Sequence, residues 1–276
     1  MALTPEQCEK RSIIKILAGS HIHGLNIETS DQDFESIVVE PLSEAIGLGQ
    51  TWEETERIGL CDAAGVRLPD TKYFSLRKWC RMAVKGNPNF LLALFTPRTH
   101  IVQETALGSQ MRDMRAMFLS KQAIRSHLGY MQGQRQRMVN HQREFGAGHG
   151  RGLPRFELIE KYGYDTKFGM HLLRLGCQGL ELATSGTVTL PMAEPVRTQL
   201  LDVRAGKLSL QQVLDWAEDL EMRMKNAFDA SSLPDEPNYA EIESWMQRVY
   251  IRSWSADRAL ADYLEDANIF GVSRVQ

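Results

Sequence analysis

The sequence has few cysteines, no long apolar run and almost no excess of either charge, and each absence excludes a class of protein. Its four cysteines lie far apart without a Cys-x-x-Cys pair, which argues against structural zinc and against a disulfide framework. No run of 18 apolar residues could span a membrane, and residues 1–11 are polar and charged where a signal peptide would be apolar. We therefore expect a cytoplasmic protein with reduced thiols.

The net charge of only −3 excludes a generic polyanion-binding protein, but the charge is unevenly distributed. Residues 121–155 contain seven basic residues and one acid, whereas residues 211–276 contain thirteen acids and six bases. The mid-chain basic segment also contains His127, Tyr130, His141 and Phe145. This combination favours a nucleic acid over a small molecule as a partner, although no recognisable RNA-binding motif is present.

The candidate functional residues lie near the N-terminus. An apolar run over 13–18 ends at Gly19-Ser20, and an Asp31-Gln32-Asp33 motif precedes a second apolar run over 37–39. We predict a strand, a phosphate-sized turn, a polar connection and a second strand. Gly19 permits close backbone approach, and Ser20 can donate to a phosphate oxygen. Asp31 and Asp33 point the same way on an extended backbone and can hold divalent cations. A lone Asp-x-Asp is common in surface turns, so the prediction depends on the ordered set.

This ordered set resembles the nucleotidyltransferase superfamily of DNA polymerase beta, whose signature is a hydrophobic strand, Gly-[Gly/Ser] and an acidic pair leading into a second strand. The likeness narrows toward the bacterial and phage "predicted nucleotidyltransferase" branch. Three later stretches carry this narrower likeness: residues 70–79, residues 85–89, and Tyr162-Gly163-Tyr164-Asp165-Thr166-Lys167 with His171 and Arg174. The sequence departs from the family pattern at Leu92-Ala93, where an acid is expected.

The resemblance implies a third carboxylate, for which Asp70 is the candidate. In relatives this position completes the metal site and helps to deprotonate the attacking hydroxyl. Asp62 is a competitor, and Pro69 could instead make Asp70 a turn residue. His21 and His23 form a His-x-His pair, but no third soft ligand is near them. We therefore interpret His21 as a hydrogen-bond donor to the nucleotide rather than as a metal ligand.

Lys167, His171 and Arg174 fall on one stripe of a predicted helix. A basic stripe is usually a solvated face, but the matched motif favours a stripe that grips phosphates of the nucleotide or of the acceptor. Asn87 is interpreted as a helix-stop residue, with a site-shaping role as the alternative.

The predicted fold class is α+β, with a small mixed β-sheet nucleotidyltransferase core over residues 1–110 and a helical domain over 111–276 that closes the cleft. Residues 43–65 are expected to be a loop-rich insertion without an assigned role. Helices are predicted over 75–84, 90–95, 111–130, 131–144, 166–182, 194–204, 209–229 and 239–264, with a glycine-rich loop over 145–152.

The resemblance implies a transfer, dependent on Mg²⁺ or Mn²⁺, of a nucleoside monophosphate from an NTP to a hydroxyl acceptor. The basic segment over 121–155 makes tRNA or other RNA the candidate acceptor. Fold does not choose among RNA, DNA, protein and small-molecule acceptors. The rival hypothesis is a non-catalytic nucleotide-sensing or interaction protein with the same fold. Retention of Asp31, Asp33 and Asp70 argues against this rival.

Overall fold

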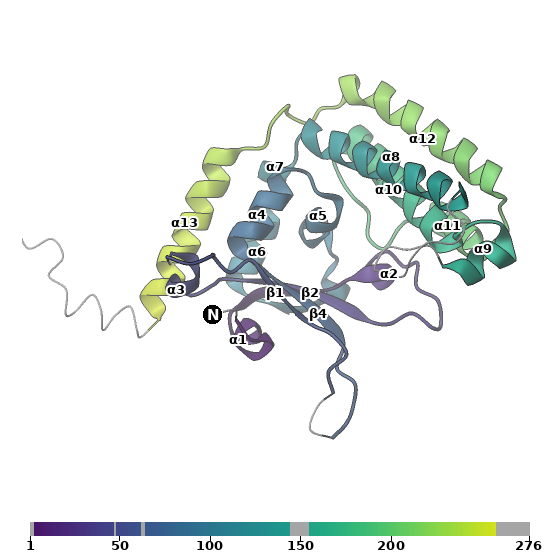
Figure 1. Cartoon of the computed structure of the whole chain (residues 1–276). Helices are drawn as coiled ribbons and strands as arrows, with labels where there is room; N and C mark the ends of the chain where they lie inside the picture. The colour runs from purple at the N-terminus through teal and green to yellow at the C-terminus, as the bar shows by residue number, and fades with distance from the viewer. Residues whose placement is uncertain (1–2, 47, 62–63, 144–154, 258–276) are drawn as a thin grey trace, which may run out of the picture.

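A computed structural model describes residues 3–46, 48–61, 64–143 and 155–257 of the chain (Figure 1). The strands are β1 (Ser12–Leu17), β2 (Asp33–Val38), β3 (Glu54–Arg57), β4 (Asp70–Ser75) and β5 (Ile101–Glu104). The helices of the first half are α1 (Pro5–Lys10), α2 (Gly19–Ile22), α3 (Leu42–Ala45), α4 (Leu76–Val84), α5 (Pro88–Phe95), the 3₁₀ turn Arg98–His100, α6 (Ala106–Asp113) and α7 (Arg115–Phe118). Those of the second half are α8 (Lys121–Arg143), α9 (Phe156–Tyr162), α10 (Thr166–Ser185), α11 (Val196–Arg204), α12 (Leu210–Ala230) and α13 (Tyr239–Ala256).

The five strands form one mixed sheet in the order β3-β4-β2-β1-β5. The β2–β4 pair is parallel, with Asp33 and Asp70 as Cα partners, and the other pairs are antiparallel. In the interior strand β1 most residues are buried because the strand has a neighbour on each side and packs beneath helices. This mixed sheet with a helical remainder confirms the predicted α+β class.

The sheet is larger than the sequence pattern predicts. The predicted loop-rich insertion over 43–65 contains α3 and the strand β3, which pairs with β4 at one sheet edge. The expectation of irregular structure there was wrong for these residues. Strand β3 alternates between exposed and half-buried positions, and such a polar edge strand carries little apolar periodicity. The competitor Asp62 lies outside the described residues.

In the helical half, α10 packs against α8, α11 and α12 (Figure 1). Asp165 caps the start of α10 by accepting from the Phe168 N–H, and Ser209 forms a capping box at the start of α12. The predicted break between residues 130 and 131 was wrong, because α8 continues through fully buried Met131. The predicted glycine-rich loop and the predicted end of the last helix at 264 lie outside the described residues.

The last described helix, α13, returns to the N-terminal half and packs against α4 and α7 (Figure 1). Its Tyr250 hydroxyl donates to Glu40 Oε1 at 2.7 Å, and the Trp254 indole N–H donates to the Glu40 carbonyl at 2.9 Å. One continuous apolar cluster runs from β1 through α10 to α13. The predicted boundary at residue 110 falls within α6, and the division into two domains stays a prediction. Among the described helices, none combines the length and apolar character that crossing a bilayer requires.

Candidate active site

The Gly19-Ser20 turn lies directly against the Asp33 carboxylate. Gly19 has a φ of 62°, and a Cβ at this position would lie 2.6 Å from Asp33 Oδ2. The Ala18 N–H also donates to the Asp33 carbonyl at 2.8 Å. Only glycine combines a left-handed backbone with such close approach to another group. The turn therefore brings backbone polar groups to the edge of the acidic pair.

The three predicted carboxylates interact electrostatically. Burial raises the pKa of Asp33, and the charges of Asp70 and Asp31 raise it further, while Lys167 and His21 lower it. Burial is the largest cause of this shift, and repulsion from the two neighbouring carboxylates adds to it, so the ionised form of Asp33 is disfavoured for both reasons. An additional cation at Asp33 would relieve this repulsion, and oxygen ligands of this type suit hard divalent cations.

Asp70 lies beside Asp33 across the parallel strands, but its carboxylate has other partners. Its Oδ1 accepts from the Gly59 N–H at 3.0 Å, and Oδ2 lies 3.7 Å from the Arg67 guanidinium. Asp31 and Asp33 line a shared cavity, whereas Asp70 is not among the residues lining it. In the described part of the chain, no three His, Cys, Asp or Glu side chains are gathered closely enough to hold a metal ion by themselves.

The cavity has a volume of about 410 Å³ and is lined from both halves of the chain. Gly19, Ser20, Asp31 and Asp33 form one wall, and Lys167, His171 and Arg174 of α10 form another. Apolar side chains, among them Leu25, Leu92 and Met170, line the rest together with the unpredicted Glu35 and Arg204. Of the predicted nucleotide-binding residues, His21 does not line the cavity, and its Nε2–H donates to the Ser30 carbonyl at 3.3 Å.

Arg174 is buried and is held by neutral groups. Its Nη1 donates to His23 Nε2 at 2.6 Å and to Gln178 Oε1 at 3.1 Å, and its Nη2 donates to His171 Nε2. The charge of Arg174 and burial lower the pKa of His171 to about 3, and burial with the same charge lowers the pKa of His23 well below its usual value. Both imidazoles are therefore neutral at physiological pH, and the arginine charge stays unbalanced.

Sequence reasoning missed the roles of His23 and Gln178 in this cluster. His23 is 5% exposed and Gln178 is 1% exposed, so neither side chain is a solvated donor. Gln178 lies four residues after Arg174, which places the two on one face of α10. That spacing was available in the sequence, but nothing in it distinguishes a glutamine that supports an arginine from one that faces solvent.

Glu35 is a further carboxylate on the acidic side of the cavity. It follows Asp33 by two residues on β2, so both side chains project to the same face of the sheet. Burial raises the pKa of Glu35 to about 7, the Lys72 charge opposes this shift, and the Asp33 charge adds to it. The Phe34-Glu35-Ser36 stretch gave no sequence signal because the predicted second strand began at Ile37.

The basic segment over 121–155 is less available for nucleic acid than its composition indicates. Lys121 forms an ion pair with Asp235, Arg135 lies 3.4 Å from Glu221, and Arg125 stacks over the Phe228 ring. His127 is 1% exposed and its Nδ1–H donates to the Ala123 carbonyl, so it does not reach solvent. Much of the positive charge on α8 thus stabilises its packing against α12 and the segment that follows.

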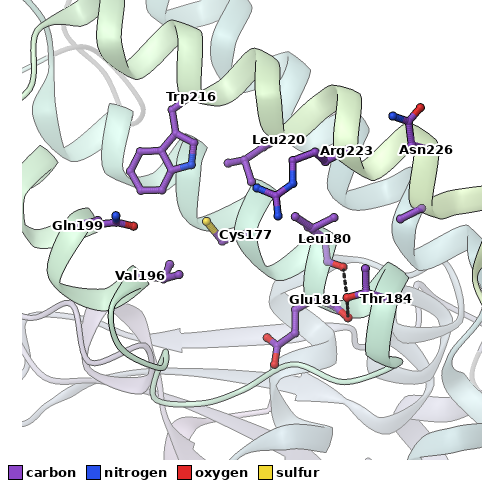
Figure 2. Close-up of a pocket in the computed structure, with 11 residues that line it drawn as sticks. Cys177, Leu180, Glu181, Thr184, Val196, Gln199, Trp216, Leu220, Arg223 and Asn226 are labelled. Atoms are coloured by element: carbon purple, nitrogen blue, oxygen red, sulfur yellow. Dashed lines mark hydrogen bonds between the residues drawn. The ribbon is translucent and has the colours of Figure 1, made fainter.

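A second cavity, of about 660 Å³, lies between α10, α11 and α12 (Figure 2). Trp216 and Arg223 project into it from α12, and Cys177 and Glu181 face it from α10. Burial raises the pKa of the Cys177 thiol to about 12, so the thiol is protonated and unreactive. This cavity is larger than the first but has none of the predicted site residues, so the smaller, charged cavity is the candidate active site.

A Gly-Ser turn that follows one strand and lies against an acidic pair leading into a second strand is the signature of a polymerase beta-like nucleotidyltransferase. The family model described as RlaP, RNA repair pathway DNA polymerase beta family, matches residues 6–248. The chain belongs to this family.

The solved structures include a nucleotidyltransferase-like protein from Exiguobacterium sibiricum 255-15, which is 12% identical to this chain. The match covers 80% of this chain and 69% of the other, with a TM-score of 0.30. A likeness at that score says nothing about the site. No curated protein matches the chain.

Proposed function

We propose that this protein transfers a nucleoside monophosphate from an NTP to a hydroxyl of an RNA acceptor, using a divalent metal ion. One observation carries the proposal: the Gly19-Ser20 turn, the acidic pair and the cationic stripe of α10 line the same cavity although more than 130 residues separate them. An acidic wall facing a cationic wall suits a metal-bound triphosphate between them. Membership of an RNA repair pathway family supports RNA as the acceptor class.

The carboxylates fit a divalent cation, because Asp31 and Asp33 line one cavity, and the charges of Asp31 and Asp70 add to the effect of burial in raising the pKa of Asp33. Asp31 and Asp33 would hold Mg²⁺ or Mn²⁺, with Asp70 beside them. When bound, such an ion neutralises phosphate charge and favours the deprotonated acceptor hydroxyl.

The remaining roles belong to the chain itself. Backbone N–H groups near Gly19 and the Ser20 hydroxyl would donate to phosphate oxygens. Arg174 and Lys167 would orient the triphosphate from the opposite wall, since their charges have no carboxylate partner within ion-pairing distance in the described ranges. In the transfer, the acceptor oxygen bonds to the α-phosphorus, the bond to the β-phosphate bridge breaks, and pyrophosphate leaves. Asp70 would accept the hydroxyl proton.

The test is incubation with each α-labelled NTP, with Mg²⁺ or Mn²⁺, and with RNA, DNA or protein as acceptor. We expect label in RNA with the wild type, none with Asp33→Asn, and an unchanged signal with Asp202→Asn. Asp202 is a matched control because its carboxylate pairs with Lys207 at the end of α11, outside the cavity. Equal incorporation by wild type and Asp33→Asn would refute the assignment.

Metal binding can be tested without turnover. At about 100 times its dissociation constant, an ion that binds only the folded state stabilises it by about 2.7 kcal/mol. Mg²⁺ should therefore raise the melting temperature of the wild type and of Asp202→Asn but not that of Asp33→Asn.

A non-catalytic nucleotide sensor is the second candidate, favoured by the engagement of the Asp70 carboxylate with Gly59 and Arg67. Saturable NTP binding without incorporation into any acceptor would support it over the enzyme.

A further inference from the structure

The start of α10 collects positive charge at one end of the charged cavity. Lys167 and Arg204 both line the cavity, and Arg155 lies beside them. The neighbouring positive charges lower the pKa values of these side chains. Burial lowers the pKa of Lys167, and the charges of Arg155 and Arg204 lower it further. Burial also lowers the pKa of Arg204, and Arg155 adds to that shift. These three cations are thus close enough to repel one another.

Asp165 is the one carboxylate among the described residues that pairs with a member of this group, and its oxygens already accept several hydrogen bonds. Asp165 is 4% exposed and accepts from the Phe168 N–H, which caps α10, and from the Arg155 N–H and guanidinium at 3.0 and 3.2 Å. Arg204 donates to the neutral Thr166 hydroxyl at 3.3 Å. Over the described residues, no carboxylate lies within ion-pairing distance of Lys167 or Arg204. Asp165 and Asp33 act on Lys167, and Asp165 acts on Arg204, only at longer range, so the group keeps an excess of positive charge.

A purely structural role accounts for only part of this arrangement. Arg204 lies in the last turn of α11, where a cation interacts favourably with the helix dipole by about 0.3–1 kcal/mol. An arginine whose side chain faces solvent would interact with the helix dipole equally well. Arg197 on the same helix has such a side chain: it is 42% exposed and pairs with Glu194. Arg204 instead lines the cavity near two other cations.

Arg204 and Arg155 lie at the other end of the α10 stripe from Arg174, which is proposed to hold the triphosphate. Arg174 lies seven residues beyond Lys167 along α10, which is about 10 Å at 1.5 Å per residue. Lys167 lies between the cationic group and the acidic pair, because its charge also lowers the pKa of Asp33. Arg155 is partly exposed, with 40% of its side chain accessible to solvent, so it can be reached from outside the cavity.

We infer that Arg204 and Arg155 bind a backbone phosphate of the acceptor strand at the entrance of the cavity, while Arg174 and His171 contact the NTP. This inference rests on the proposed function for the identity of the acceptor. It places the acceptor contact at α10 and α11 rather than on α8, where Lys121, Arg125 and Arg135 already have partners on α12 and beyond.

The experiment measures binding of a labelled single-stranded RNA oligonucleotide by fluorescence anisotropy, without NTP, across a series of KCl concentrations. Arg204→Gln should bind at least fivefold more weakly than the wild type at low salt. Its slope of log K against log[KCl] should be shallower by about 0.7, the value for one lost contact to a single-strand phosphate. Arg155→Gln should behave in the same way.

Arg197→Gln is the matched control on the same helix, and its RNA binding should equal that of the wild type. Equal melting temperatures of all variants would exclude unfolding as the cause. NTP binding by Arg204→Gln should be unchanged. If Arg204→Gln and Arg197→Gln bind RNA equally well, the inference is wrong. It is also wrong if Arg204→Gln loses only NTP affinity, because the group would then bind the terminal phosphate of the nucleotide. Both outcomes come from binding measurements without turnover. A failure of the proposed transfer reaction would appear only in the label-incorporation assay and can therefore be distinguished from a failure of this inference.

Discussion

At the residue scale, the site separates charges that the protein itself does not neutralise. Asp31, Asp33 and Glu35 lie on one side of the cavity, and Lys167 and Arg174 lie on the other. Holding like charges together in a half-buried cavity destabilises the fold unless a ligand balances them. Removing one of these charges should therefore weaken ligand binding and also change the stability of the fold and its dependence on pH.

Glu35 provides a pH test of this view. Burial raises its folded-state pKa to about 7, above the ordinary value of 4.5, so the folded protein binds the proton more tightly than the unfolded chain does. Its contribution to stability is complete below about pH 4.5 and is lost as the pH rises through about 7. Between about pH 6 and 8 the wild type should lose about 1 kcal/mol relative to Glu35→Gln in urea unfolding experiments. Parallel pH profiles of the two proteins would contradict the burial of this carboxyl group.

Substitutions of His23 test whether the positive charge of Arg174 contributes to NTP binding. His23→Glu would place a carboxylate beside the buried guanidinium and neutralise it, whereas His23→Gln keeps a neutral polar side chain there. We expect the glutamate variant to bind NTP at least tenfold more weakly, about 1.4 kcal/mol, and the glutamine variant to bind it nearly as well as the wild type. Equilibrium titration with NTP in the absence of acceptor measures this. Equal affinities of the two variants would show that the Arg174 charge is not used for the nucleotide.

At the element scale, glycines decide how closely the helices approach. Gly86 follows the end of α4 with a φ of 70°, and a Cβ there would lie 2.3 Å from the Ala123 Cα of α8. The clash is with backbone, so it cannot be relieved by moving a flexible side chain. Glycine at this position therefore lets the turn between α4 and α5 approach the start of α8 closely.

Gly86→Ala should therefore destabilise the protein by at least about 2 kcal/mol, because left-handed backbone alone costs a non-glycine residue about 1–2 kcal/mol. Gly129 is the control: it lies inside α8, where an added methyl group would have no atom within 4 Å, and Gly129→Ala should stabilise the helix by about 0.5–1 kcal/mol. Chemical denaturation of both variants gives the comparison. A Gly86→Ala protein as stable as the wild type would mean that α4 and α8 separate readily.

At the scale of the whole molecule, α13 connects the last described part of the chain to the sheet. Glu40 is 1% exposed and depends on Tyr250 for a hydrogen bond to its carboxylate, while burial raises its pKa. The Arg77 N–H also donates to the Tyr250 hydroxyl at 3.1 Å. The contacts of α13 thus belong to the same core as those of the sheet.

Tyr250→Phe should cost about 1–3 kcal/mol, the cost of leaving buried polar partners unsatisfied. Because the apolar cluster is continuous from β1 to α13, we expect one calorimetric transition in the wild type and a single, lower transition in the variant. Two separated transitions, of which only one moves, would instead support independent domains divided near residue 110.

The sequence by itself determined the local features of this protein. Gly19-Ser20 and Asp33 lie within fifteen residues of each other, and antiparallel pairing of β1 and β2 brings them together with no distant contact needed. The caps at Asp165 and Ser209 are equally local, since each depends on an N–H three residues away. Periodicity and spacing predict such features because they are properties of one element or one hairpin.

Only the tertiary structure decided which distant groups meet. His23 and Arg174 are 151 residues apart, Arg204 reaches the cavity only because α11 packs on α10, and the partners of Asp70 come from the loop before β4 and from the segment predicted to be an insertion. The pattern within a helix shows which residues share a face, but not what that face contacts. Burial then sets the chemistry: it keeps His23 and His171 neutral, removes His127 from solvent and leaves Arg174 charged for a ligand.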